Sequence, residues 1–296
     1  MGIVAVNAQE KTEQWLLEFE AVHYTYPVAQ ESALQGLTLR LESGKKSVLI
    51  GQNGCGKSTL FLLAAGLCKP QSGRVLSNAQ PLHYNHNFIR QWRQKVGLVF
   101  QDPEQQLVAP TVAADISYGL SNLSLPEREI VQRVEQVLSD FDLQSLSTRP
   151  VHHLSLGQKK RVALAGVMVL QPELLLLDEP TAYLDPLQTR KLLAELERIK
   201  ATGTTMLIAT HDLDFAYEWA DWIFVMHQGK LVLEGEAKDV FSQRQLMAKL
   251  QLGLPVLWEV WEALPQELRS QDITSIPKTI GELREQLNQS ILKNKN

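Results

Sequence analysis

The stretch Gly51-Gln52-Asn53-Gly54-Cys55-Gly56-Lys57-Ser58-Thr59 fits G-x-x-x-x-G-K-[ST], the pattern of a phosphate-binding loop. The apolar run at residues 46–50 is typical of a buried strand, and the apolar run at 60–67 predicts a helix that ends near Gly66. Glycines lack a Cβ, so the backbone between strand and helix can curl and point its N–H groups at phosphate oxygens. Strand, glycine loop and helix in this order predict a nucleoside triphosphate site.

The residue types in the loop suit the parts of that ligand. We expect the Lys57 ammonium to reach the β- and γ-phosphates and the Ser58 hydroxyl to bind Mg²⁺. The other nucleotide-binding residues expected from the loop are Gly51, Asn53, Gly54, Cys55, Gly56 and Thr59. Because Cys55 would lie near Lys57 and a helix N-terminus, its thiol pKa is expected to fall below the usual value.

Composition narrows the classes of protein. Of the 296 residues, 44% are hydrophobic, which is ample for a buried core. The formal net charge of −4 lacks the basic excess typical of nucleic-acid-binding proteins, so no nucleic-acid partner is expected. Two cysteines are too few for a disulfide framework. The longest apolar runs, such as 162–170, are too short to cross a bilayer, so membrane contact is expected through a partner protein.

The first part of the chain predicts mostly strands. Residues 1–15 are polar and aperiodic, and we expect a loose tail there. Residues 16–26 alternate, with Leu17, Phe19 and Ala21 on one face, and residues 34–41 alternate again. Further short strands are expected at 73–75 and 96–100.

Residues from about 102 to 158 predict an inserted helical subdomain. Residues 124–127 form a capping-box pattern, with Pro126 expected in the first helical turn. Strands are expected again at 174–178 and 204–209 around a helix at 187–202, and a hairpin follows at 221–225 and 229–233. The fold class is therefore α/β, a phosphate-loop core with a mixed sheet and a helical insertion, over residues 16–250.

Residues 251–296 predict a short C-terminal helical appendage. Val256, Leu257, Val260, Trp261 and Leu264 recur at helical spacing, and a second capping box at 279–282 opens another amphipathic helix. Two short helices cannot bury their apolar faces alone. They must pack on the core or on another subunit, and we expect a contact between subunits.

Two acidic residues follow the apolar strand at 174–178. Asp178 stands at the carboxyl end of this strand, where it is expected to hold Mg²⁺. Glu179 is the candidate general base for an attacking water. The alternative is that the two acids only end a strand before Pro180, but the upstream phosphate-binding loop favours a catalytic interpretation.

Residues 154–162, Leu-Ser-Leu-Gly-Gln-Lys-Lys-Arg-Val, resemble the L-S-G-G-Q signature of ATP-binding-cassette (ABC) ATPases, with Leu156 in place of the first glycine. Further motifs resemble that family in order along residues 17–250. The resemblance implies that Tyr26 stacks on adenine, that Gln101 contacts Mg²⁺ and that His211 is the switch histidine. Residues 182–185 resemble the D-loop, although Tyr183 stands where glycine or alanine is usual.

The resemblance also implies how such a chain works. Two cassettes face each other head to tail and enclose two ATP molecules, each between one subunit's phosphate-binding loop and the other's signature. The residues expected to reach the partner's ATP are Ser155, Gly157, Gln158 and Asp185. The expected catalytic group is Glu179, His211 and Gln101, with ATP and Mg²⁺ as cofactors. The second ATPase subunit would be a copy of this chain or a relative.

Residues 101–107, Gln-Asp-Pro-Glu-Gln-Gln-Leu, are similar to the V-F-Q-x-P-D-x-Q run in ATPases of energy-coupling-factor importers. This resemblance implies an ATPase on the cytoplasmic face of the membrane that powers uptake of cobalt or nickel. Its partners would be an integral membrane coupling subunit and a membrane subunit that binds the substrate, with Glu104 and Gln106 facing them. The alternatives are a vitamin importer of the same type and a soluble ABC ATPase outside transport.

Overall fold

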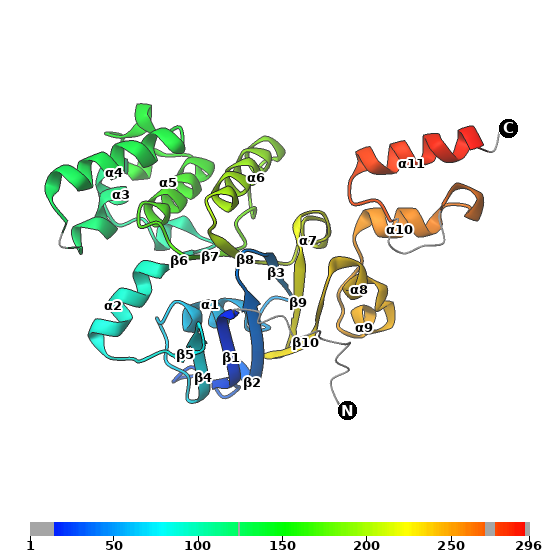
Figure 1. The fold of residues 1–296 in the computed structure, drawn as a ribbon, viewed down its shortest axis with the longest axis horizontal. Helices are drawn as coiled ribbons and strands as arrows, with labels where there is room; N and C mark the ends of the chain where they lie inside the picture. Colours follow the sequence, from blue (N-terminus) through cyan, green and yellow to red (C-terminus); the bar gives the residue numbers. More distant parts are fainter. Residues whose placement is uncertain (1–14, 124, 270–275, 294–296) are drawn as a thin grey trace.

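The computed structural model describes residues 15–123, 125–269 and 276–293, which fold into two sheets flanked by helices (Figure 1). The tail expected at residues 1–15 lies, except for Trp15, outside the described residues. An antiparallel sheet with the order β2-β1-β4-β5 comprises β1 (Trp15–Tyr24), β2 (Leu34–Glu42), β4 (Ser72–Ser77) and β5 (Gln80–Pro81). A six-stranded sheet with the order β10-β9-β3-β8-β7-β6 comprises β3 (Lys46–Ile50), β6 (Val96–Val99), β7 (Leu174–Asp178), β8 (Thr205–Thr210), β9 (Trp222–His227) and β10 (Lys230–Gly235). The six-stranded sheet is mixed, as expected, because β10 pairs antiparallel with β9 while the other pairs are parallel.

The helical insertion gathers at one end of the molecule (Figure 1). Its helices are α3 (Val112–Ser121), α4 (Glu127–Asp140) and α5 (Leu156–Met168), and α5 packs on both others, so the helical group extends beyond residue 158. Pro126 precedes α4 as its N-cap instead of lying in its first turn, and Ser124 lies outside the described residues. The remaining helices of the cassette are α1 (Lys57–Ala64), α2 (His86–Lys95), α6 (Pro186–Ala201), α7 (Leu213–Trp219), α8 (Ala237–Ser242) and α9 (Arg244–Lys249).

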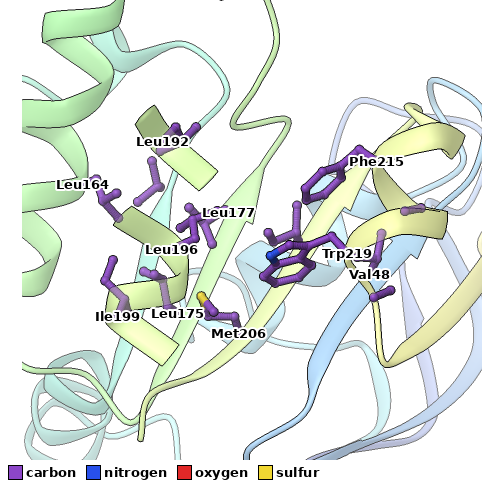
Figure 2. Close-up of a cluster of buried hydrophobic side chains, with 14 of the residues drawn as sticks. Val48, Leu164, Leu175, Leu177, Leu192, Leu196, Ile199, Met206, Phe215 and Trp219 are labelled. Carbon is purple, nitrogen blue, oxygen red and sulfur yellow. The ribbon is translucent and has the colours of Figure 1, made fainter. Parts of the chain in front are cut away.

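The central strand β7 is buried on both faces, which explains its unbroken apolar sequence. Leu175 and Leu177 join one cluster of hydrophobic side chains, and Leu174 and Leu176 join the other. Figure 2 shows Leu175 and Leu177 beside Leu164 of α5 and Leu192 and Leu196 of α6. This packing on two sides fixes the strand that carries Asp178 at its carboxyl end.

The alternation expected in β1 breaks at Ala21. Leu17 and Phe19 are buried as predicted, but Ala21 has φ 47° and is exposed, and Val22 takes the buried position. The register of β1 against β2 shifts between Phe19 and Val22, which is the signature of a bulge. The extra residue moves every later side chain of the strand to the opposite face.

The C-terminal appendage packs on the cassette through its first helix, α10 (Val256–Ala263). Trp258 and Trp261 are buried, whereas Val256 and Val260 are exposed. The predicted apolar stripe was therefore wrong at the two valines. The buried face is formed by two tryptophans three residues apart, which share one side of a helix. Large aromatic side chains bury more area than valines, so they take the core-facing side.

The second helix of the appendage, α11 (Ile280–Lys293), begins at the predicted cap. Thr279 Oγ1 accepts from the Glu282 amide at 3.1 Å, and Glu282 Oε2 accepts in return from the Lys278 amide at 2.8 Å. Leu283 packs against the main hydrophobic cluster, but Ile280 remains 69% exposed. Among the described helices, none has both the length and the apolarity needed to cross a membrane.

Candidate functional site

The phosphate-binding loop connects β3 to α1, as the motif requires. Gly54 and Gly56 have φ values of 79° and 108°, in the region that favours glycine. A Cβ on Gly56 would lie 2.6 Å from the Ala33 carbonyl oxygen, so this position has no room for a side chain. The Lys57 ammonium is buried inside the loop and donates to the carbonyl oxygens of Gly51 at 2.6 Å and Gln52 at 3.2 Å.

A cavity of about 400 Å³ opens beside this loop. It brings together residues that lie far apart in the sequence, and its lining includes Tyr26, Asn53, Gly54, Gly56, Lys57, Ser58, Thr59, Gln101, Asp178 and Glu179. The Tyr26 hydroxyl lies 3.1 Å from Thr59 Oγ1, which places the tyrosine ring at the cavity wall. The cavity therefore unites the predicted phosphate, metal and base residues in one place.

Two of the three predicted metal ligands, Ser58 and Asp178, are in direct contact. Ser58 Oγ donates to Asp178 Oδ2 at 2.6 Å, and Gln101 lines the same cavity. Burial raises the pKa of Asp178, the Ser58 hydrogen bond and the Lys57 charge act to lower it, and the Glu179 charge acts to raise it. Hydroxyl, carboxylate and amide oxygens are the ligands that Mg²⁺ prefers, so these residues fit a magnesium ion.

Glu179 is buried and held from two sides. Its Oε1 lies 2.8 Å from Nδ1 of His211, and its Oε2 accepts from the Thr210 hydroxyl at 3.0 Å. The Glu179 amide donates to the Ala209 carbonyl at 2.8 Å, so the end of β8 fixes both its backbone and its side chain. A carboxylate with one oxygen against an imidazole is the arrangement expected of an oriented general base.

The signature residues form a group of their own at the start of α5. Ser155 and Gln158 make a reciprocal capping box, with bonds of 3.4 Å and 2.9 Å. A Cβ on Gly157 would lie 2.1 Å from the Gln188 side chain of α6, so this glycine allows the two helices to approach. Leu156 is the first residue of α5 and has no positive φ, so its backbone does not require glycine.

The D-loop residues lie beside this group. Asp185 caps α6, accepting from the Gln188 amide at 2.8 Å. Tyr183 is 82% exposed at φ 62°, in the left-handed region that a glycine would adopt at lower cost. Neither the signature residues nor Asp185 line the cavity around Lys57, so the structure does not bring them to the phosphate-binding loop of the same chain.

The expectation for Cys55 was wrong. Its side chain is 5% exposed and packs in the hydrophobic cluster between the two sheets. Burial raises the pKa of the Cys55 thiol, and this outweighs the opposing effects of the Lys57 charge and the loop N–H groups. Gly54 and Gly56 line the cavity, whereas the Cys55 thiol packs in the core.

Two residues that contact Glu179 or the turn after it were not selected from the sequence. Thr210 orients Glu179, and Lys160 donates to three carbonyl oxygens of the turn after β7. Lys160 precedes the buried residues Leu164 and Val167 by four and seven positions, so it shares their face of α5. That spacing was a readable signal for a buried lysine.

Comparison with known proteins shows the family of this chain. The family model described as ABC transporter matches residues 34–182. An ABC transporter ATP-binding protein of Nostoc sp. is 58% identical over 89% of this chain and 95% of its own length. The energy-coupling factor transporter ATP-binding protein EcfA2 of Clostridium perfringens is 40% identical over 93% of this chain and 96% of its own.

Two solved structures give the same result. The structure of cbiO1 from Clostridium perfringens, part of the ABC transporter complex cbiONQ, has a TM-score of 0.71 and 41% identity, covering 84% of this chain and all of that one. A dimeric structure of the ATP-binding cassette MJ0796 bound to ADP and Pi has a TM-score of 0.67 and 25% identity, covering 75% and 98%. With its phosphate-binding loop, Gln101, Asp178 and Glu179 gathered at one cavity and its relatives matched along nearly their whole length, the chain belongs to the ATP-binding subunits of ABC transporters.

Proposed function

We propose that this chain is the ATPase of an energy-coupling-factor importer that carries cobalt or nickel ions, working from the cytoplasmic face of the membrane. The observation that carries this proposal is the run at residues 101–107, which is similar to the corresponding run in that branch. Relatives named as energy-coupling factor ATP-binding proteins, and cbiO1 of the cbiONQ complex, support it.

The packing of this run supports a role in coupling. Gln106 Oε1 accepts from the Phe100 amide at 3.2 Å, and its Nε2 donates to the Ala163 carbonyl of α5 at 3.3 Å. Gln106 therefore points inward, contrary to the expectation that it faces a partner. Glu104 remains at the surface and bonds to Lys159 of α5 at 2.5 Å. A membrane subunit docked on Glu104 would act on the Gln101 loop and on the signature helix together.

In the proposed reaction, Ser58, Asp178 and Gln101 would hold Mg²⁺, which would supply positive charge to the phosphates. Lys57 would neutralise phosphate oxygens of the bound nucleotide. Glu179 takes the proton of a water whose oxygen bonds to the γ-phosphorus while the bond to the ADP oxygen breaks. The products are ADP and inorganic phosphate. The contact between Glu179 and His211 supports this assignment because it directs the carboxylate.

A second cassette completes the proposed assembly. Ser155, Gly157, Gln158 and Asp185 lie away from the cavity of their own chain, which suits an ATP held by a partner. The likeness to a dimeric cassette supports the same arrangement. We also propose that α11 contributes to pairing, since Ile280 on this helix is exposed.

Reconstitution tests the proposed solute. The tagged chain is purified from detergent-solubilised membranes with its bound partners and placed in liposomes that contain ATP on the cassette side. Uptake of radioactive cobalt or nickel above a control with Glu179→Gln supports the proposal. Uptake of a labelled vitamin in place of either ion would assign the vitamin alternative, and recovery of ribosomes or DNA without a membrane protein would contradict import altogether.

A further inference from the structure

Lys160 is almost fully buried in α5, and nothing in the nucleotide site described above uses it. Its Nζ donates to three carbonyl oxygens: Glu179 at 3.2 Å, Pro180 at 2.9 Å and Ala182 at 2.8 Å. An ammonium has three N–H donors, so this set uses all of them inside the protein. The carbonyls belong to the turn that follows β7, carries Glu179 and leads to Asp185.

The turn needs such a support. Glu179 has φ 45°, in the left-handed region that a residue with a Cβ seldom adopts. Strained backbone at a site persists only when the surrounding structure holds it. The three carbonyl oxygens of this turn that accept from the Lys160 ammonium provide that hold.

We propose that Lys160 is a positioning residue for ATP hydrolysis, which ties the turn at residues 179–182 to α5 and so sets the direction of the Glu179 carboxylate. The proposal rests on the proposed role of Glu179 as general base. Helix α5 would then link the signature to Glu179, because Ser155 is its N-cap and Lys160 lies on its buried face. A movement of the signature helix would then shift Glu179 directly.

The environment of Lys160 gives the proposal a pH signature. Burial lowers the pKa of Lys160 from 10.5 to about 8, against the opposing charges of Glu179 and Asp102. The neutral amine has two N–H donors and a lone pair, so one carbonyl loses its bond and turnover should fall as the pH rises through about 8. Between pH about 8 and 10.5, Lys160 is deprotonated in the folded protein but protonated in the unfolded chain. Raising the pH through this range therefore stabilises the folded state. As the pH rises above about 8, kcat should therefore fall while the protein becomes more stable. Loss of activity through unfolding would instead be accompanied by a loss of stability.

The first test is Lys160→Met, which removes the ammonium and keeps a chain of similar length. We expect kcat to fall about 10- to 100-fold, as misplacement of a catalytic group by about 1 Å does, with KM and the Kd of a fluorescent ATP analogue unchanged. Lys191→Met, at an exposed lysine of α6, is the matched control and should behave as wild type. A wild-type kcat for Lys160→Met, or a loss that appears in Kd alone, would overturn the proposal.

The second test remains informative if Lys160→Met does not fold. Lys160→Arg keeps its charge at every pH used, so its kcat should show no fall above pH 8, and a fall like that of wild type would overturn the proposal. In the Glu179→Gln variant, adding Lys160→Met should lower the single-turnover rate of hydrolysis only slightly further, because both changes act through the Glu179 carboxylate. If Lys160→Met lowered this rate by as much as it lowers that of the wild type, Lys160 would act through a group other than Glu179, which would overturn the proposal. Normal turnover by Glu179→Gln alone would refute the base assignment, a different outcome from failure of Lys160→Met.

Discussion

Replacing Trp258 by alanine is expected to loosen the C-terminal appendage from the cassette. Trp258 is 1% exposed, and its ring centroid lies 5.6 Å from that of Tyr217 in α7 and 6.2 Å from that of Phe241 in α8. Its indole N–H donates to Glu262 Oε1 at 3.1 Å. The Tyr217 hydroxyl donates in turn to the Ile276 carbonyl at 3.0 Å, so the same aromatic cluster holds the chain on both sides of residues 270–275.

The magnitude follows from this burial. Truncating a buried tryptophan to alanine costs about 3–5 kcal/mol of unfolding free energy, and the two aromatic contacts account for about 1–3 kcal/mol of it. At about 2–4 °C per kcal/mol for a large domain, the melting temperature should fall by about 6–20 °C. Val260, on the exposed side of the same helix, is the matched control, because its truncation should change stability by less than about 0.5 kcal/mol.

Far-ultraviolet circular dichroism during heating measures the transition, and limited trypsin digestion shows whether residues beyond 250 are released first. Both variants are compared with wild type in the same buffer without nucleotide. Early release of the appendage from Trp258→Ala alone is the expected result. If Trp258→Ala melts within about 2 °C of wild type and is digested no faster, the appendage does not depend on this aromatic cluster and the packing argument is wrong.

Three further predictions concern the surface and the loop. N-Ethylmaleimide should modify Cys68 before Cys55, because Cys68 is only half-buried, whereas burial shields the Cys55 thiol and raises its pKa. Peptide mass spectrometry measures the order of labelling, and faster labelling of Cys55 would contradict its burial. Glu104→Ala should leave ATP hydrolysis by the isolated subunit unchanged and reduce solute uptake by the whole complex; uptake at the wild-type rate would place the docking surface elsewhere. Ile280→Asp should weaken pairing of subunits in light scattering across a dilution series without lowering the melting temperature, and an unchanged mass would remove α11 from the interface.

The sequence was most informative where function and fold depend on short contiguous segments. The loop from Gly51 to Thr59, the strand ending at Asp178 and the signature at Ser155 each combine a local backbone conformation with the side chains that act there. Alternating and continuous apolar segments therefore located the strands other than β5, and the ABC ATPase resemblance predicted the fold. The same local logic placed Thr279 at the start of α11.

The remaining features depend on neighbours that are distant in the sequence. The Cys55 thiol could point to a phosphate or to the core, and the sheets that bury it are built from strands on both sides of the loop. Ala21 reads as the next residue in an alternating strand, and only pairing with β2 reveals the bulge. Gln106 and Lys160 are polar side chains whose partners, Ala163 and the turn after Asp178, are brought to them by packing. Secondary-structure propensity and residue spacing do not indicate partners that are distant in the sequence.

Glu179 is proposed to act as the general base when this chain hydrolyses ATP. The most direct measurement compares steady-state phosphate release by the wild-type subunit and Glu179→Gln with MgATP, alongside the Kd of each for nucleotide. Glutamine can keep the Thr210 bond and face His211, so folding and binding should survive while turnover falls about 10²- to 10⁴-fold. Turnover by Glu179→Gln near the wild-type rate would contradict the role of Glu179 as general base.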